Sequence, residues 1–211
     1  MANTILDIMT TSTVMPVIVI KQPEQAVPLA RALVEGGLRV LEVTLRTAHG
    51  LDAIRKMARE LPDAIVGAGT VTEPDQIDAV IDAGGEFMVS PGSTPKLIEA
   101  ALQKPIKLLP GISTPSEAMM LLEYGIQYMK FFPAEAAGGR PMLKSIHGPL
   151  PQITFCPTGG ITPESANDYL ALPNVACVGG SWMVPQNLVD AGDWAGITAL
   201  AKQASTLGNL A

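Results

Sequence analysis

Histidine and cysteine, the residues that most often hold transition metals, are scarce in this chain. His49 and His147 are the only histidines, and neither lies in a spacing such as HxH or HExxH that would assemble a metal site. Cys156 and Cys177 are the only cysteines, and both lie in short apolar stretches typical of reduced core thiols. We therefore expect no bound metal, no cofactor and no disulfide framework.

Positive charge and long apolar runs are scarce as well. The chain has 14 Lys and Arg against 20 Asp and Glu, and its net charge of -6 would repel nucleic acid and anionic lipid at long range. An anionic substrate would need a local basic pocket. No apolar run approaches the roughly 18 residues of a membrane span, and residues 1–9 hold no basic cluster. The expectation is a soluble cytoplasmic protein without nucleic-acid or membrane partners.

Charged residues of either sign make up only 16% of the chain, whereas 47% of its residues are hydrophobic. This number of charged side chains is too small to cover the surfaces of several small domains. The composition therefore favours one compact core and is compatible with subunit contacts. No polar linker or low-complexity segment interrupts the 211 residues. We therefore predict a single domain over residues 1–211.

Short β-branched or apolar runs alternate with longer segments of helical period along the whole chain. Such alternation predicts repeated βα units around a parallel sheet. Several helical segments open with Thr followed by Pro, a helix-capping signal, at Thr94, Thr114 and Thr162. The eight predicted strands are residues 15–20, 40–45, 64–68, 87–90, 106–109, 128–132, 153–156 and 175–178.

Eight units in one domain of this length favour an α/β fold of the TIM-barrel type, a single (β/α)₈ barrel. The segment before the first predicted strand is expected to form an extra N-terminal helix that covers the bottom of the barrel. An open, doubly wound sheet of eight strands is the alternative, because the sequence does not show whether the sheet closes.

Two charged residues lie inside predicted strands, where both faces of a parallel strand are normally buried. Glu42 lies in the second strand and Lys130 in the sixth. Each has a structural explanation when taken alone: a buried ion pair, or a side chain that reaches outward to solvent. Together they suit one chemistry. A desolvated lysine amine can attack a ketone, and a neighbouring carboxylate can move the protons that follow.

Further candidates lie at the predicted carboxyl ends of the strands. Arg46 could hold a substrate carboxylate through a bidentate contact, or it could be an ordinary surface arginine. Thr70 offers a hydroxyl group and could equally be a plain helix cap. Phe132 follows Lys130 closely and could exclude water from it.

Glycine pairs end the last two predicted strands. Gly159 and Gly160 follow Thr158, and Gly179 and Gly180 precede Ser181. Turns use such pairs freely, but two pairs at these loops are a stronger signal, because barrel enzymes frequently build a phosphate site there.

The quoted segments resemble, along nearly the whole chain, the family of 2-keto-3-deoxy-6-phosphogluconate (KDPG) and 4-hydroxy-2-oxoglutarate (KHG) aldolases. Seven runs carry the resemblance, in the same order. They are VIV (17–19), VLEVTLRT (40–47), VGAGTV (66–71), LPGIST (109–114), KFFPAE (130–135), FCPTGGI (155–161) and GGSW (179–182).

The resemblance implies a metal-free homotrimer of α/β barrels. In such an enzyme Lys130 forms the Schiff base, Glu42 transfers protons, and Arg46 and Thr70 hold the pyruvate-end carboxylate. Phe132 contacts the substrate, and the pocket for the distal phosphate is formed by Thr158, Gly159, Gly160, Gly180 and Ser181.

The implied reaction is class I aldol cleavage of a keto-acid sugar phosphate, KDPG, to pyruvate and glyceraldehyde 3-phosphate. KHG would give pyruvate and glyoxylate. Three alternatives remain at this point: a lyase with another preference, such as the galactonate epimer or KHG, a sugar-phosphate isomerase or epimerase, and an inactive sugar-phosphate-binding module.

Overall fold

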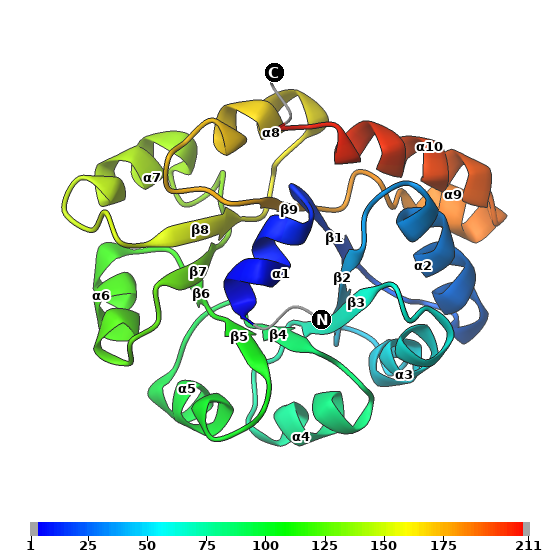
Figure 1. Ribbon diagram of the computed structural model, residues 1–211, viewed down its shortest axis with the longest axis horizontal. Helices are drawn as coiled ribbons and strands as arrows, with labels where there is room; N and C mark the ends of the chain where they lie inside the picture. Colours follow the sequence, from blue (N-terminus) through cyan, green and yellow to red (C-terminus); the bar gives the residue numbers. More distant parts are fainter. Residues whose placement is uncertain (1–3, 209–211) are drawn as a thin grey trace.

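Helices surround curled parallel sheets in the computed structural model, which describes residues 4–208 (Figure 1). One sheet has the strand order β5-β4-β3-β2-β1-β9 and the other the order β6-β7-β8, and every pair of named strands is parallel. The strands are β1 (Val14–Ile18), β2 (Val40–Thr44), β3 (Ile65–Gly69), β4 (Phe87–Val89), β5 (Lys107–Leu109), β6 (Gly111–Ile112), β7 (Tyr128–Phe131), β8 (Thr154–Pro157) and β9 (Val178–Gly180).

The helices follow the strands in alternation. The predicted capping signals at Thr94, Thr114 and Thr162 are confirmed, since each threonine hydroxyl accepts a backbone N–H three residues later and a proline follows it. The helices are α1 (Ile5–Thr11), the 3₁₀ helix η1 (Pro23–Gln25), α2 (Ala26–Glu35), α3 (Gly50–Glu60), α4 (Asp75–Asp82), α5 (Pro95–Leu102), α6 (Pro115–Glu123), α7 (Gly139–His147), α8 (Pro163–Leu170), α9 (Gln186–Ala191) and α10 (Trp194–Ser205).

The two sheets come next to each other in two places. β5 and β6 are separated only by Pro110, whose ring nitrogen has no N–H to donate to a ladder. On the other side, isolated parallel bridges join Phe155 to Val175 and Thr158 to Gly179, so β8 lies beside the segment that leads into β9. Figure 1 shows the strands of both sheets around one centre, with α1 drawn across that centre and the other helices outside the strands.

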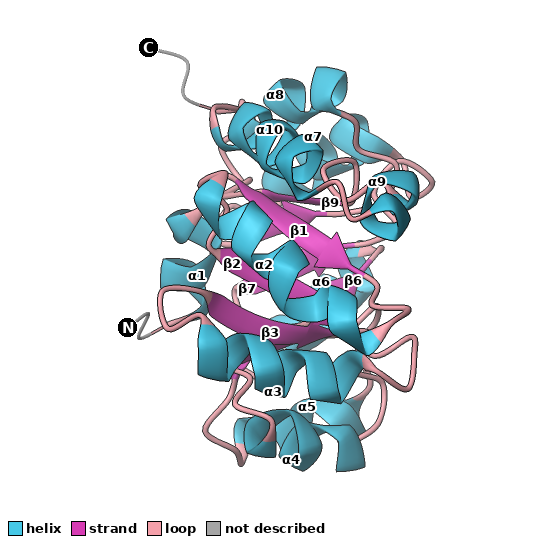
Figure 2. Ribbon diagram, turned by 90° about the vertical axis from the view of Figure 1, so that its right-hand side faces the viewer, coloured by secondary structure: helices cyan, strands magenta, loops and turns pink. Residues whose placement is uncertain are grey.

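Two apolar clusters fill the fold. The larger lies between the strands and the outer helices. The smaller, called the inner cluster here, is formed by residues in or next to the strands and by two residues of α1. Figures 1 and 2 agree in placing α1 across the end at which the strands begin. The inner cluster consists of Ile8, Met9, Met15, Val40, Phe87, Val89, Leu109, Cys156 and Cys177.

Apart from shifts of one or two residues at strand ends, the observed strands depart from the prediction in two places. The predicted strand 106–109 corresponds to β5, but the short strand β6 that follows it was not predicted. β6 forms because the chain beyond Pro110 changes its pairing partner from β4 to β7. The run 175–178 begins too early: β9 starts at Val178 and continues through Gly179 and Gly180. Glycine has a low strand propensity, which hid these two positions, yet they pair in register with Met15 and Pro16 of β1.

The ends of the predicted 1–211 domain, residues 1–3 and 209–211, lie outside the described residues. No helix between residues 4 and 208 is long and apolar enough to cross a membrane.

Candidate active site

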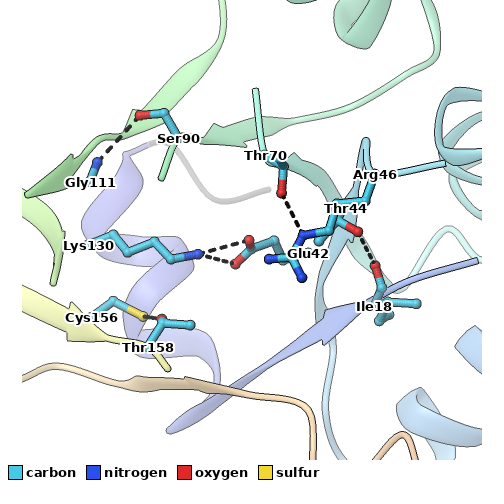
Figure 3. A network of polar contacts seen from close by, with 10 residues as sticks. All are labelled: Ile18, Glu42, Thr44, Arg46, Thr70, Ser90, Gly111, Lys130, Cys156 and Thr158. Atoms are coloured by element: carbon cyan, nitrogen blue, oxygen red, sulfur yellow. Dashed lines mark hydrogen bonds and ion pairs between the residues drawn. The ribbon is translucent and has the colours of Figure 1, made fainter. Parts of the chain in front are cut away.

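Lys130 and Glu42 meet inside the fold near the carboxyl ends of β7 and β2. The Nζ atom of Lys130 lies 3.1 Å from Oε1 and 3.5 Å from Oε2 of Glu42 (Figure 3). Both residues are buried, with exposures of 5% and 2%. A pair buried this deeply loses most of its hydration, so each charge depends on the other for compensation.

Small neighbours make room for this pair. A Cβ atom at Gly69 would lie 2.3 Å from Oε1 of Glu42, so a larger residue in β3 would displace the carboxylate. In β7, Lys130 lies in register with Gly111 and Cys156, and its backbone N–H donates to the Pro110 carbonyl at 2.8 Å. The lysine amine thus extends toward the carboxylate from a strand that is held on both sides.

Arg46 and Thr70 lie next to each other beyond the ion pair. The guanidinium Nε of Arg46 donates to the Thr70 hydroxyl at 3.2 Å. Thr70 has a φ of 60°, which places a β-branched residue in the left-handed region. Such a conformation costs of the order of 1 to 3 kcal/mol and persists only where the surroundings impose it. The N-cap residue of α4 is Pro74 and not Thr70. The alternative considered from the sequence, that Thr70 is a plain helix cap, is therefore wrong.

The glycine pairs form the outer part of the site. Gly159 and Gly160 have φ values of 107° and 78°, which other residues adopt only with strain. A Cβ at Gly179 would lie 2.2 Å from the Thr158 hydroxyl oxygen, and one at Gly180 would lie 1.9 Å from the Trp182 ring. A larger residue at any of these four glycines would therefore strain the backbone or collide with a neighbour, and all four glycines line the cavity.

A cavity of about 300 Å³ extends along Arg46, Phe132 and the two glycine pairs. Seven of the predicted site residues line it, and the Lys130 amine lies 5.4 Å from the ring of one of them, Phe132. Thr70 is not part of the lining, but its hydroxyl accepts a hydrogen bond from Arg46, which is. The seven are Arg46, Phe132, Thr158, Gly159, Gly160, Gly180 and Ser181.

The composition of the cavity suits a small anionic ligand. It is lined by the exposed Arg46 and Ser181, whereas the buried Lys130–Glu42 pair is not part of its lining and lies next to Phe132, which is. Among residues 4–208, no three His, Cys, Asp or Glu side chains gather into a set able to hold a metal ion.

Comparison with known proteins identifies the family. The family model described as KDPG and KHG aldolase matches residues 5–200. The chain is 56% identical over 197 residues to a KHG/KDPG aldolase of Escherichia coli K12, which covers 93% of this chain and 92% of the relative. The chain belongs to the KDPG and KHG aldolase family.

Two solved structures of family members superpose closely on the fold. A KDPG aldolase from Legionella pneumophila, with pyruvate captured at low pH as a covalent carbinolamine intermediate, has a TM-score of 0.93 and 49% identity, covering 95% of this chain and 97% of that one. The 2-keto-3-deoxy-6-phosphogluconate aldolase of Zymomonas mobilis with 3-phosphoglycerate has the same score and identity, covering 98% and 97%.

The candidate site of this aldolase-family chain also includes residues that were not predicted from the sequence. Val17, Val19 and Ile161 line the cavity, together with Gly179 of the second glycine pair. The alternation of β1 points to the two valines, but alternation alone does not tell a cavity wall from core. Thr44 is a second addition, since its buried hydroxyl donates to the Ile18 carbonyl at 3.0 Å and ties β2 to β1 beside Glu42.

Proposed function

We propose that this protein is a class I aldolase that cleaves KDPG to pyruvate and glyceraldehyde 3-phosphate, and that also acts on KHG to give pyruvate and glyoxylate. One observation carries the proposal: a buried lysine amine lies 3.1 Å from a buried carboxylate and 5.4 Å from the ring of Phe132, which lines the cavity. Family membership and the carbinolamine of the Legionella pneumophila relative support the same chemistry.

The reaction begins with removal of a proton from the Lys130 ammonium, for which Glu42 is the nearest acceptor. The neutral amine adds to the 2-keto carbon and forms a carbinolamine, which loses water to become an iminium ion. Glu42, directly or through a water molecule, then takes the proton of the 4-hydroxyl group. The electron pair of the bond between carbons 3 and 4 moves into the iminium, the aldehyde leaves and an enamine remains.

The second half of the reaction regenerates the enzyme. Protonation of the enamine carbon gives the iminium of pyruvate, and addition of water to that iminium releases pyruvate and the free amine of Lys130. The carboxylate of Glu42 moves protons in both halves, which is why its distance from Nζ matters.

The two ends of the substrate bind to different parts of the cavity. Arg46 and Thr70 hold the carboxylate next to the keto group, and their mutual hydrogen bond positions both donors. Thr158, Gly159, Gly160, Gly180 and Ser181 bind the distal phosphate through backbone N–H groups and hydroxyls. Phe132 lies between the two ends and covers the amine.

The direct test of this function is release of pyruvate. Purified protein is incubated with KDPG, and pyruvate is measured with a coupled dehydrogenase. We expect one pyruvate and one glyceraldehyde 3-phosphate per substrate, and slower release of pyruvate from KHG. Comparison of kcat/KM for the gluconate and galactonate epimers measures the sugar preference. Absence of pyruvate from all three substrates would contradict the proposal.

The same proposal covers the architecture and the assembly. The parallel bridges from Phe155 to Val175 and from Thr158 to Gly179 of β9, and the position of β6 directly after β5, favour closure of the two sheets into one (β/α)₈ barrel with α1 as an extra N-terminal helix. We also infer one domain over residues 1–211, a cytoplasmic location, catalysis without metal or cofactor, and a homotrimer. Light scattering at micromolar concentration tests the assembly, for which a monomer is the contradicting result.

A further inference from the structure

Glu135 and Tyr169 form a hydrogen bond beside the outer part of the cavity. The Tyr169 hydroxyl donates to Oε1 of Glu135 at 2.5 Å. Tyr169 is fully buried and lies on α8, the helix that follows the Gly159–Gly160 loop. Burial of the ring, together with the neighbouring carboxylate of Glu135, raises the pKa of Tyr169 well above its usual range, so the hydroxyl keeps its proton and remains a donor.

Glu135 also contacts the glycine loop directly. Its backbone N–H donates to the Gly159 carbonyl at 3.1 Å, and the N–H of Ala134 donates to the Thr158 carbonyl at 2.8 Å. A Cβ at Gly160 would lie 2.8 Å from both Cβ and Cγ of Glu135. The side chain of Glu135 therefore packs against the loop that carries half of the proposed phosphate site.

The pair links the two ends of the site. Glu135 lies five residues after Lys130, on the connection from β7 to α7. Tyr169 holds that connection against α8, and a Cβ at Gly139, the first residue of α7, would lie 3.1 Å from its hydroxyl oxygen. Figure 1 shows β7, β8, α7 and α8 in one sector of the molecule. Loss of this hydrogen bond would therefore affect both the Gly159–Gly160 loop and the segment that follows Lys130.

We propose that Glu135 and Tyr169 are positioning residues that hold the Thr158–Gly160 loop in the shape that binds the distal, anionic end of the substrate. This inference rests on the proposed function. The pair does not attract the anion, because a carboxylate repels phosphate, and Glu135 is exposed enough for solvent to screen its charge. Its contribution is therefore geometric: the hydrogen bond fixes the side chain on which the loop rests.

The first experiment removes the donor alone. Tyr169→Phe should raise KM for KDPG about tenfold, the factor that corresponds to loss of one modest interaction, and should change kcat much less. Turnover of KHG, which has no phosphate, should change by less than about twofold. Tyr124→Phe is the matched control, since the Tyr124 hydroxyl makes an equivalent bond to Glu99 at 3.0 Å, away from the cavity.

The second experiment uses the acceptor. Glu135→Gln keeps an oxygen that can accept from Tyr169 and should stay close to the wild-type KM for KDPG, whereas Glu135→Ala should match Tyr169→Phe. Competitive inhibition by glycerol 3-phosphate should weaken in parallel in the two damaging variants.

The outcomes separate this inference from the proposed function. If wild-type protein releases no pyruvate from either substrate, the function itself fails. If it cleaves both, and Tyr169→Phe lowers turnover of KDPG and KHG equally or leaves both unchanged, the positioning role of the pair is contradicted. Equal damage from Glu135→Gln and Glu135→Ala would contradict the geometric explanation.

Discussion

The two ends of the strands are both buried but contain different kinds of side chain. In β2, Val40 belongs to the apolar inner cluster, whereas Glu42 and Thr44, farther along the same strand, are buried polar residues. β8 changes in the same way, from Cys156 in the inner cluster to Thr158 directly after the strand. β2 and β8 thus pass from an apolar interior to a polar interior as they run toward their carboxyl ends.

This difference separates stability from chemistry. The apolar end gains free energy from burial, whereas each buried polar group at the other end costs desolvation that its partner must offset. In (β/α)₈ barrels, the architecture proposed for this chain, residues at the carboxyl ends of the strands are interpreted as catalytic and those at the amino ends as structural. Substitutions at the polar end should therefore reduce activity, with or without a loss of stability, whereas substitutions at the apolar end should reduce stability and leave the activity per folded molecule unchanged.

The largest effect on activity is expected at Lys130. Lys130→Met should abolish pyruvate release from KDPG, because methionine has a similar volume but no nucleophile. It should also lower the free energy of unfolding by about 3 kcal/mol, since the buried Glu42 carboxylate loses its partner. Denaturant unfolding with activity assays measures both, and the double variant Lys130→Met, Glu42→Gln should regain most of the stability. If Lys130→Met were stable and active, the proposed difference between the two ends of the strands would be contradicted.

Glu42→Gln should have the next largest effect. It removes the proton acceptor but keeps the shape, and turnover should fall by a factor of about 10² to 10⁴, the usual contribution of a positioned general base. Steady-state kinetics on KDPG and KHG should show the same factor, because both reactions need the same proton transfers. Wild-type turnover in this variant would exclude Glu42 as the base.

Gly160→Asp should weaken one end of the site only. We expect cleavage of KDPG to lose about 2 to 4 kcal/mol of transition-state binding, through displacement of the loop and repulsion of the phosphate, while KHG is affected much less. Gly125→Asp is the matched control, because Gly125 has a φ of 75°, close to the 78° of Gly160, and a Cβ there meets nothing within 4 Å. Equal losses on both substrates would indicate general damage.

The smallest effect on activity is expected in the inner cluster. Phe87 is fully buried, and Gly67 leaves the space that its ring fills. Phe87→Leu should lower the free energy of unfolding by about 1.5 kcal/mol and leave kcat/KM per folded molecule unchanged. Denaturant unfolding and steady-state kinetics on the same preparation test this prediction. A loss of kcat with an unchanged free energy of unfolding would contradict the structural role assigned to the inner cluster.

Much of the site could be predicted because its residues contradict their surroundings. A lysine and a glutamate within buried strands, and glycine pairs where strands end, are visible without coordinates. Capping signals likewise located the starts of α5, α6 and α8. By contrast, α7 begins after Gly138, in the left-handed region and without a side-chain cap, so the sequence gives no comparable signal there.

Other features depend on contacts that distant segments make only after folding. The left-handed conformation of Thr70 and its bond to Arg46 are imposed by two neighbouring strands. The bond between Glu135 and Tyr169 spans 34 residues and joins a loop to a helix. Neither residue type nor local spacing distinguishes this tyrosine from a core residue, since its ring is indeed buried.

The central claim is that Lys130 forms the covalent intermediate, and borohydride trapping tests it most directly. Wild-type protein is incubated with pyruvate and sodium borohydride, digested, and analysed by mass spectrometry. We predict a reduced pyruvate adduct on Lys130, none in Lys130→Met, and a slower but detectable adduct on Lys130 in Glu42→Gln. An adduct on Lys107, Lys144 or any other lysine, or no adduct in an active wild-type preparation, would contradict the account.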